Sequence, residues 1–210
     1  MKTNPTDPSS AKATTHSASR SIKQVTALDL PTPAVADLPD DNRRYFEKCQ
    51  QKLGMIPNVL TAYSHNVAQL DVFSRFYNEL MLGESELTPL EREMIAVVVS
   101  AENHCFYCLT AHGAAVREYS QDPALGEQLV MNYRSASLST RHRAMLDYAS
   151  LLTRTPALVT PADAAPLRQA GFSDTAIWDI CNLIGFYNMT NRIASAVDMR
   201  PNEAYHSQHR

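Results

Sequence analysis

Hydrophobic side chains along this chain recur mostly three and four residues apart, the spacing of an amphipathic helix. In the segment 66–82 they form one apolar stripe made of Val67, Leu70, Phe73, Tyr77 and Leu80. No stretch shows the sustained alternation of apolar and polar residues that a half-buried strand would show. We therefore expect an all-α protein.

Capping residues, glycines and prolines divide this pattern into separate helices. Thr88, followed by Pro89 and by Glu91 three positions after the threonine, has the sequence of a capping box. Gly83 and Gly171 are typical of the residue that ends a helix. The expected helices cover about 41–53, 57–63, 66–82, a segment beginning at Pro89, 104–119, 123–133, 140–153, 161–170 and 174–197.

With 210 residues and 44% hydrophobic content, the chain can bury one sizeable core. Residues 1–38 are rich in Ser, Thr, Ala and Pro, and we expect a disordered or extended N-terminal tail there. Its apolar group from Ile22 to Leu30 is a candidate for docking onto the domain or onto a neighbouring subunit. The helical domain then covers 39–200, and Pro201 is expected to begin a C-terminal tail over 201–210.

The net charge of −3 gives no electrostatic reason to expect nucleic acid or an anionic membrane as a partner. No apolar run approaches 18 residues, and the N-terminus lacks the apolar core of a secretory signal. We therefore expect a soluble, cytoplasmic protein.

Reactive side chains gather between residues 93 and 112. If residues 104–118 form a helix, Cys105, Cys108 and His112 lie within an arc of about 60° on one face. On the same continuous helix Glu93 would lie about 120° from Cys105, so we place it on a preceding helix packed alongside. There its carboxylate can orient or recharge His112, which gives a proton relay from carboxylate to imidazole to thiol.

The start of this helix affects the reactivity of the cysteines. Asn103 is a suitable N-cap, which puts Cys105 in the first turn, where the helix macrodipole favours a thiolate. His112 lies one turn after Cys108 and offers that thiol a base. Lowering a cysteine pKa from about 8.5 to about 6 raises the thiolate fraction at neutral pH about thirtyfold. Spacing alone leaves open which cysteine attacks, because the macrodipole favours Cys105 and the base favours Cys108.

At these residues the chain resembles the superfamily of alkylhydroperoxidase AhpD and carboxymuconolactone decarboxylase. Its peroxidase branch carries Glu, eleven residues, Cys-x-x-Cys, three residues and His, which here reads Glu93, Cys105-Phe-Tyr-Cys108 and His112. The flanking sequence from Leu87 to Ile95 and from Cys105 to Gly113 is similar to that of a peroxidase-related subgroup. The similarity extends from about Arg43 to the C-terminus. AhpD itself has a histidine where this chain has Tyr107.

The resemblance implies an AhpD-like helical bundle and a thiol peroxidase. In this reading Cys108 attacks the hydroperoxide, becomes a sulfenic acid and condenses with Cys105 to a disulfide. An external dithiol, such as a lipoyl- or thioredoxin-type protein, then reduces the disulfide, and no metal, haem or flavin cofactor is implied. The resemblance also implies a homo-oligomer, either a trimer or a hexamer.

Two other classes of function stay open. One is an oligomeric redox sensor or interaction module whose dithiol toggles without turnover. The other is a decarboxylase or lactone-handling enzyme of the same superfamily, although those members generally lack the cysteine pair.

Several residues near the motif have alternative interpretations. A zinc site would use His104 and His112 with the two cysteines, but His104 points about 100° away from Cys105 on a helix, and we expect it at the entrance of the substrate pocket instead. Tyr107 either packs or donates a hydrogen bond near the peroxide. Asn188, Asn191 and Arg192 place polar groups on the apolar final helix, either to satisfy its end or to line the pocket. Cys49 and Cys181 receive no role.

The chain also contains a short internal repeat. Residues 87–94 align with residues 138–145 at an offset of 51, matching a leucine, a hydroxyl N-cap, an arginine and a methionine. The same offset places Pro156 opposite Cys105. A duplicated helical hairpin and a chance similarity of two capped helices both explain this match.

Overall fold

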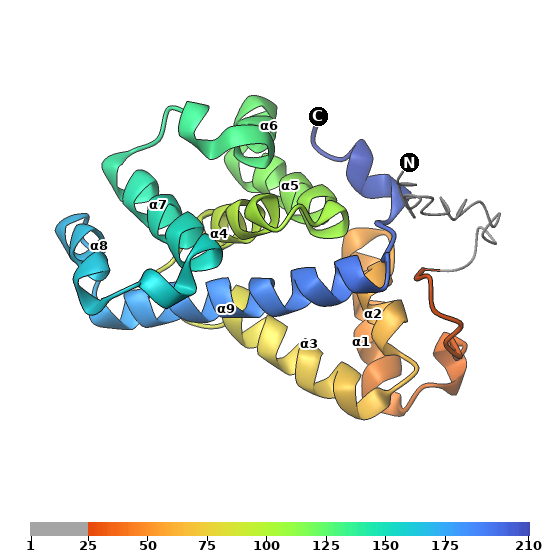
Figure 1. The fold of residues 1–210 in the computed structure, drawn as a ribbon. Helices are drawn as coiled ribbons and strands as arrows, with labels where there is room; N and C mark the ends of the chain where they lie inside the picture. Colours follow the sequence, from red (N-terminus) through yellow and green to blue (C-terminus); the bar gives the residue numbers. More distant parts are fainter. Residues whose placement is uncertain (1–24) are drawn as a thin grey trace, which may run out of the picture.

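The computed structural model describes residues 25–210 (Figure 1), so residues 1–24 of the predicted N-terminal tail lie outside the described residues. Within the described residues there is no strand, and the all-α prediction is confirmed. The α-helices are α1 (Asp40–Leu53), α2 (Asn58–Tyr63), α3 (Val67–Leu82), α4 (Pro89–Glu102), α5 (Phe106–Ser120), α6 (Pro123–Asn132), α7 (Thr140–Arg154), α8 (Ala165–Gln169) and α9 (Asp174–Ala196). Short 3-10 turns are η1 (Val35–Asp37), η2 (Tyr133–Ser135), η3 (Pro156–Leu158), η4 (Pro161–Ala164) and η5 (Glu203–His206).

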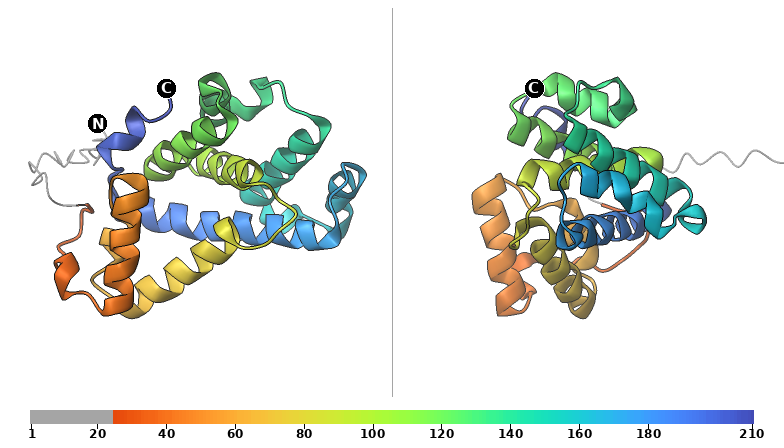
Figure 2. Two further views of the ribbon diagram at one scale, coloured as in Figure 1. Left: turned by 180° about the vertical axis from the view of Figure 1, so that it is seen from behind. Right: turned by 90° about the vertical axis from the view of Figure 1, so that its left-hand side faces the viewer.

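Helix α4 forms the centre of the molecule. It packs against α3, α5, α6, α7 and α9, and all its residues from Glu91 to Ser100 are buried. A helix that is apolar on nearly all sides is stable only when other helices surround it. Helix α9 runs the length of the molecule, with α8 near its N-terminal end and α2 near its C-terminal end (Figures 1 and 2).

Thr88, predicted from the sequence, is the N-cap of α4, and Ser139 and Asn66 are the N-caps of α7 and α3. The Thr88 hydroxyl accepts a hydrogen bond from the Glu91 backbone N–H at 3.2 Å, and the Glu91 carboxylate accepts one from the Thr88 backbone N–H at 2.9 Å. Ser139 and Asn66 accept hydrogen bonds from first-turn N–H groups of α7 and α3. Each cap satisfies backbone donors that the helix itself leaves free.

The predicted start of the motif helix was wrong. Asn103 is not an N-cap; it follows the last residue of α4, and its side-chain amide bonds to α9 instead. Phe106 is the first residue of α5 and Cys105 is its N-cap. His104 lies before the helix with φ of 53°, in the left-handed region. The turn from α4 to α5 is therefore only three residues long.

The first described residues pack beside the segment that ends α9 and follows it. The Ala27 N–H donates to Val197 O at 2.7 Å and the Arg200 N–H donates to Val25 O at 2.9 Å. Part of the segment expected to dock, from Val25 onward, therefore contacts the domain, whereas Ile22 lies outside the described residues.

The ordered structure also continues past Pro201, where the sequence had predicted its end. The buried Arg117 guanidinium donates to Tyr205 O at 2.9 Å and to Gln208 O at 3.0 Å, and Tyr205 itself lies in the 3-10 turn η5. A proline ends the helix that precedes it. It does not prevent the residues after it from being held by another helix, here by Arg117 of α5.

The internal repeat is visible in its first helix only. Thr88 and Ser139 are both N-caps, of α4 and α7. Opposite Cys105, however, Pro156 begins the 3-10 turn η3 rather than a helix of the length of α5. The described part of the chain contains no helix that is long and apolar enough to cross a membrane.

Candidate functional site

The short turn between α4 and α5 brings the two cysteines under the end of α9. Cys105 and Cys108 are both buried, with 1% and 4% of their surface exposed. Their neighbours are mostly apolar and come from α2, α5 and the end of α9: Val59, Ala62, Ala111, Ala194, Val197 and Met199. The dithiol therefore lies in a largely apolar environment, where an ionised sulfur needs specific hydrogen-bond donors.

The sulfur atoms of Cys105 and Cys108 lie 2.9 Å apart, and both cysteines are free thiols. A disulfide bond is about 2.05 Å long, so the two sulfurs need to approach by about 0.9 Å to form one. One turn of helix separates the two residues. The pair can therefore become a disulfide with a small local movement.

His112 and Glu93 form a second pair beside the dithiol. The His112 Nδ1 atom lies 2.6 Å from Glu93 Oε2, and the side chains are 13% and 8% exposed. The edge of the imidazole ring contacts the Tyr187 ring at a centroid distance of 4.7 Å. A carboxylate only accepts hydrogen bonds, so Nδ1 carries the proton and Nε2 is the basic nitrogen of the neutral ring.

Contact between the two thiols separates their pKa values. When one sulfur is ionised, the remaining S–H group stabilises it, and removal of the second proton becomes unfavourable. The pKa of Cys105 is lowered to about 6, mainly by the hydrogen bond from the Cys108 thiol, while burial opposes this change. The pKa of Cys108 is raised, first by its hydrogen bond to Cys105 and then by burial. The two thiols therefore lose their protons at well separated pH values, Cys105 first.

Three side chains at the dithiol were not identified as site residues from the sequence: Ser100, Asn191 and Ser195. Ser195 hydrogen bonds to the Cys105 sulfur, and Ser100 and Asn191 hydrogen bond to the Cys108 sulfur. From the sequence, satisfaction of the end of the final helix was the favoured interpretation of Asn191, ahead of a wall of the pocket. That interpretation is wrong, because the completely buried Asn191 side chain bonds to the Asn103 and Ser100 side chains and not to the backbone at the end of α9. An asparagine within an apolar stripe was the signal that pointed to this position.

Tyr107 and His104, the two weak pocket candidates, have different surroundings. The buried Tyr107 hydroxyl oxygen accepts a hydrogen bond from the Val59 backbone N–H at 3.0 Å, so it ties α5 to the first turn of α2. Burial raises the pKa of Tyr107 well above its ordinary value. His104 is exposed, and its left-handed backbone places it in the turn before Cys105.

Across residues 25–210, no three His, Cys, Asp or Glu side chains are grouped so that they could hold a metal ion. Cys49 and Cys181 lie away from the dithiol, on α1 and α9, and the Cys181 sulfur is 3.7 Å from the Tyr148 hydroxyl.

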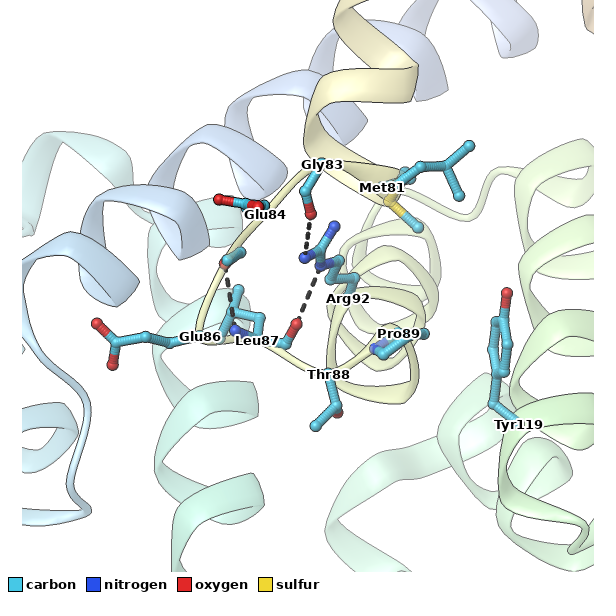
Figure 3. A pocket seen from close by; sticks show the side chains of 11 residues that line it. Met81, Gly83, Glu84, Glu86, Leu87, Thr88, Pro89, Arg92 and Tyr119 are labelled. Carbon is cyan, nitrogen blue, oxygen red and sulfur yellow. Dashed lines mark hydrogen bonds between the residues drawn. The ribbon is translucent and has the colours of Figure 1, made fainter.

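A pocket of about 430 Å³ lies at the junction of α3 and α4, with Tyr119 of α5 at its side (Figure 3). The Arg92 guanidinium in its wall donates to the backbone carbonyls of Leu80, Gly83 and Leu87 at 2.8–3.1 Å. Arg92 therefore holds the connection between the two helices. Neither cysteine lines this pocket, and we do not take it as the reactive site.

The region that carries the dithiol and the Glu93–His112 pair matches a known protein family. The family model described as "Carboxymuconolactone decarboxylase family" matches residues 70–150, which include all four motif residues. An uncharacterized protein of Escherichia coli strain K12, YnjA, is 30% identical over 129 residues, covering 60% of this chain and 69% of the relative.

Two solved structures are similar over nearly their whole length. An uncharacterized peroxidase-related protein from Silicibacter sp. TM1040 is 59% identical with a TM-score of 0.87, covering 92% of this chain and 100% of the other. An AhpD-core peroxidase-related protein from Ralstonia eutropha JMP134 is 38% identical with a TM-score of 0.85, covering 89% and 97%. The chain belongs to the carboxymuconolactone decarboxylase family and has the AhpD-like fold.

Proposed function

We propose that this protein is a thiol-dependent peroxidase that reduces hydroperoxides with its Cys105–Cys108 pair. The observation that carries the proposal is the position of a dithiol with sulfurs 2.9 Å apart, on the same helix as an imidazole held by Glu93 at 2.6 Å. The membership of an AhpD-like, peroxidase-related group supports the same class of reaction.

The first half-reaction is a displacement at oxygen. The Cys108 thiolate attacks one oxygen of the hydroperoxide, forms an S–O bond and breaks the O–O bond. The leaving alkoxide takes a proton and departs as an alcohol, or as water when the substrate is hydrogen peroxide. His112 is the group that takes the one proton that the dithiol loses and returns it to the leaving oxygen, while Glu93 holds the ring so that its basic nitrogen is free.

The second half-reaction forms the disulfide. The Cys105 sulfur attacks the sulfur of the Cys108 sulfenic acid, and the hydroxyl group leaves as water. The two thiols have then supplied both electrons that reduced the peroxide, so this cycle uses no metal or organic cofactor. An external dithiol, in our proposal a lipoyl- or thioredoxin-type protein, must return two electrons before the next turnover.

Cys108 is the attacking residue in this proposal although the pKa of Cys105 is the lower of the two. The sulfurs are in contact, so a proton passes between them without a carrier. Transfer of the Cys108 proton to Cys105 leaves the charge on the sulfur that lies one turn before His112. The lowered pKa of Cys105 thus supplies the pair with its charge, and the base near Cys108 directs the attack.

The test is peroxide consumption measured with a panel of reductants: a small dithiol, a dihydrolipoyl protein and a reduced thioredoxin. We expect many turnovers per protein with at least one of these reductants and none after Cys108→Ser. The variants Cys49→Ser and Cys181→Ser serve as matched controls and should retain activity. Consumption that stops at one peroxide per protein with every dithiol would contradict the proposal and support a redox sensor.

A further inference from the structure

A series of polar side chains crosses the otherwise apolar contact between α4 and α9. The Asn103 amide donates to Asn188 Oδ1 and to Asn191 Oδ1, each at 3.0 Å. The Asn191 amide in turn donates to Ser100 Oγ at 3.0 Å. Asn103 and Asn188 are half-buried, whereas Asn191 and Ser100 are completely buried. We call these four residues the asparagine–serine seam.

The buried end of the seam has two protons directed to one sulfur. Asn191 has two amide protons, and one of them is used by Ser100 Oγ. Ser100 accepts that bond, which leaves its own hydroxyl proton to donate. Both side chains hydrogen bond to the Cys108 sulfur. The asparagine and the serine therefore present one donor each to the Cys108 sulfur.

The two cysteines have separate sets of partners. Cys105 receives hydrogen bonds from the Ser195 hydroxyl and the Cys108 backbone N–H. Cys108 receives hydrogen bonds from Ser100 and Asn191 of the seam. Donors to a sulfur favour its charged form, and in an apolar enclosure they are the main source of stabilisation for that charge. The seam therefore influences which of the two sulfurs carries the charge.

We propose that Ser100 and Asn191 are positioning residues that hold the Cys108 sulfur and favour its thiolate over its thiol. This inference rests on the proposed function in taking Cys108 as the attacking cysteine. Asn103 acts indirectly. Its amide donates to the Asn191 side-chain oxygen, which orients the Asn191 amide protons toward Ser100 and the Cys108 sulfur.

Other titratable groups lie around the dithiol and are the same in every variant of the test. They are Tyr107 and His112 from α5, Glu93 from α4 and Tyr187 from α9, while Cys105 is replaced by serine throughout. Burial keeps the pKa values of Tyr107 and Tyr187 far above neutral. Because these groups are identical in the background and in each seam variant, a shift of the midpoint between them reports on the donor that was removed.

The experiment measures alkylation of Cys108 by iodoacetamide as a function of pH, in the full chain carrying Cys105→Ser. Serine is a favourable N-cap, so this background retains the start of α5. We expect Ser100→Ala and Asn191→Leu each to raise the midpoint by about one pH unit, because each removes one hydrogen bond to a charged atom. Below the midpoint the rate should fall about tenfold, and at high pH the rates should converge.

Asn182→Leu is the matched control, since it makes the same change on α9 at a residue whose amide bonds to Trp178 O. Its midpoint should not move. An unchanged midpoint in Ser100→Ala, or an equal loss of rate at every pH, would overturn the inference. If Asn191→Leu does not fold, judged by circular dichroism, Ser100→Ala alone decides, because it removes a single atom.

Alkylation needs no peroxide and no turnover, so this test is separate from that of the proposed function. A raised midpoint in a protein that consumes no peroxide would leave the inference standing and remove the peroxidase proposal. Peroxide turnover with an unchanged alkylation midpoint would support the peroxidase proposal and overturn the inference about Ser100 and Asn191.

Discussion

The His112 Nδ1 atom lies 2.6 Å from Glu93 Oε2, across the contact between α4 and α5. This bond joins a residue of the second turn of α4 to one in the middle of α5, 19 positions later in the chain. If the two act as one base, replacing either should remove most of what both supply. We expect His112→Ala and Glu93→Ala each to slow peroxide consumption by about 100-fold.

The double variant His112→Ala with Glu93→Ala provides the control for this prediction. It should be little slower than the slower single variant, because residues that act as a unit are not additive. Glu118→Ala, which removes an exposed carboxylate of α5, should leave the rate unchanged. Two losses that multiply to about 10,000-fold would show that the residues act independently.

Reactivity of the dithiol should depend on pH near 6. The pKa of Cys105 is lowered to about 6, first through the hydrogen bond from Cys108. The thiolate fraction of that cysteine therefore rises with pH and is about 90% at pH 7 and about 10% at pH 5. Iodoacetamide labelling of the wild type, located by mass spectrometry, should show a midpoint near pH 6 at Cys105. Cys108→Ala should move it upward, since the S–H donor is lost.

The capping box of α4 should make the fold sensitive to acid. Burial opposes ionisation of Glu91, but the Thr88 backbone N–H and Arg141, 2.7 Å away, outweigh it and lower the pKa of Glu91. A folded-state pKa below the unfolded value gives stability that is present above the unfolded value, about 4.5, and is lost as pH falls through the folded one.

We therefore expect Glu91→Gln to lower the free energy of unfolding by about 1–2 kcal/mol at pH 7. The difference from the wild type should shrink below about pH 4.5. Urea unfolding at pH 7 and at pH 3.5 measures both values, and Glu84→Gln, at an exposed residue before α4, is the matched control. An effect of Glu91→Gln that is equal at the two pH values would contradict this account.

Assembly remains a prediction. Large apolar side chains are exposed on α9, with Trp178 at 70%, Met189 at 45% and Ile193 at 37% of their surface. Such side chains are typical of surfaces that a second subunit covers. We expect light scattering to report a trimer or a hexamer of the 23.4 kDa chain. A monomer at micromolar concentration would count against this expectation.

Helix boundaries set by local hydrogen bonds could be predicted from the sequence. Thr88 and Ser139 cap α4 and α7 through N–H groups three residues later, so the information lies within a few positions. The start of α5 could not be predicted in this way. Asn103 looks like an N-cap, but its amide is used by Asn188 and Asn191, 85 and 88 positions later. Tertiary contacts with α9 therefore determine where the turn between α4 and α5 ends and α5 begins.

The same distinction applies to the candidate site. The spacing of Cys105, Cys108 and His112 along one helix predicted that they share a region. The donors to Cys108 could not be paired from the sequence, because Ser100 and Asn191 lie 91 positions apart and meet only when α4 packs on α9. The contact between Arg117 and the C-terminal segment could not be predicted for the same reason. The buried Arg117 guanidinium bonds to Tyr205 O, 88 positions later, in a segment for which the sequence predicted a tail.

The central claim is that Cys108 attacks the peroxide and Cys105 resolves the sulfenic acid. The direct measurement treats Cys105→Ser and Cys108→Ser with one equivalent of hydroperoxide, traps sulfenic acid with a dimedone-type reagent, and locates the adduct by mass spectrometry. We predict one adduct, on Cys108 in Cys105→Ser, and no peroxide consumption by Cys108→Ser. An adduct on Cys105 in Cys108→Ser, with peroxide still consumed, would contradict the claim and assign the attack to the cysteine at the helix N-cap.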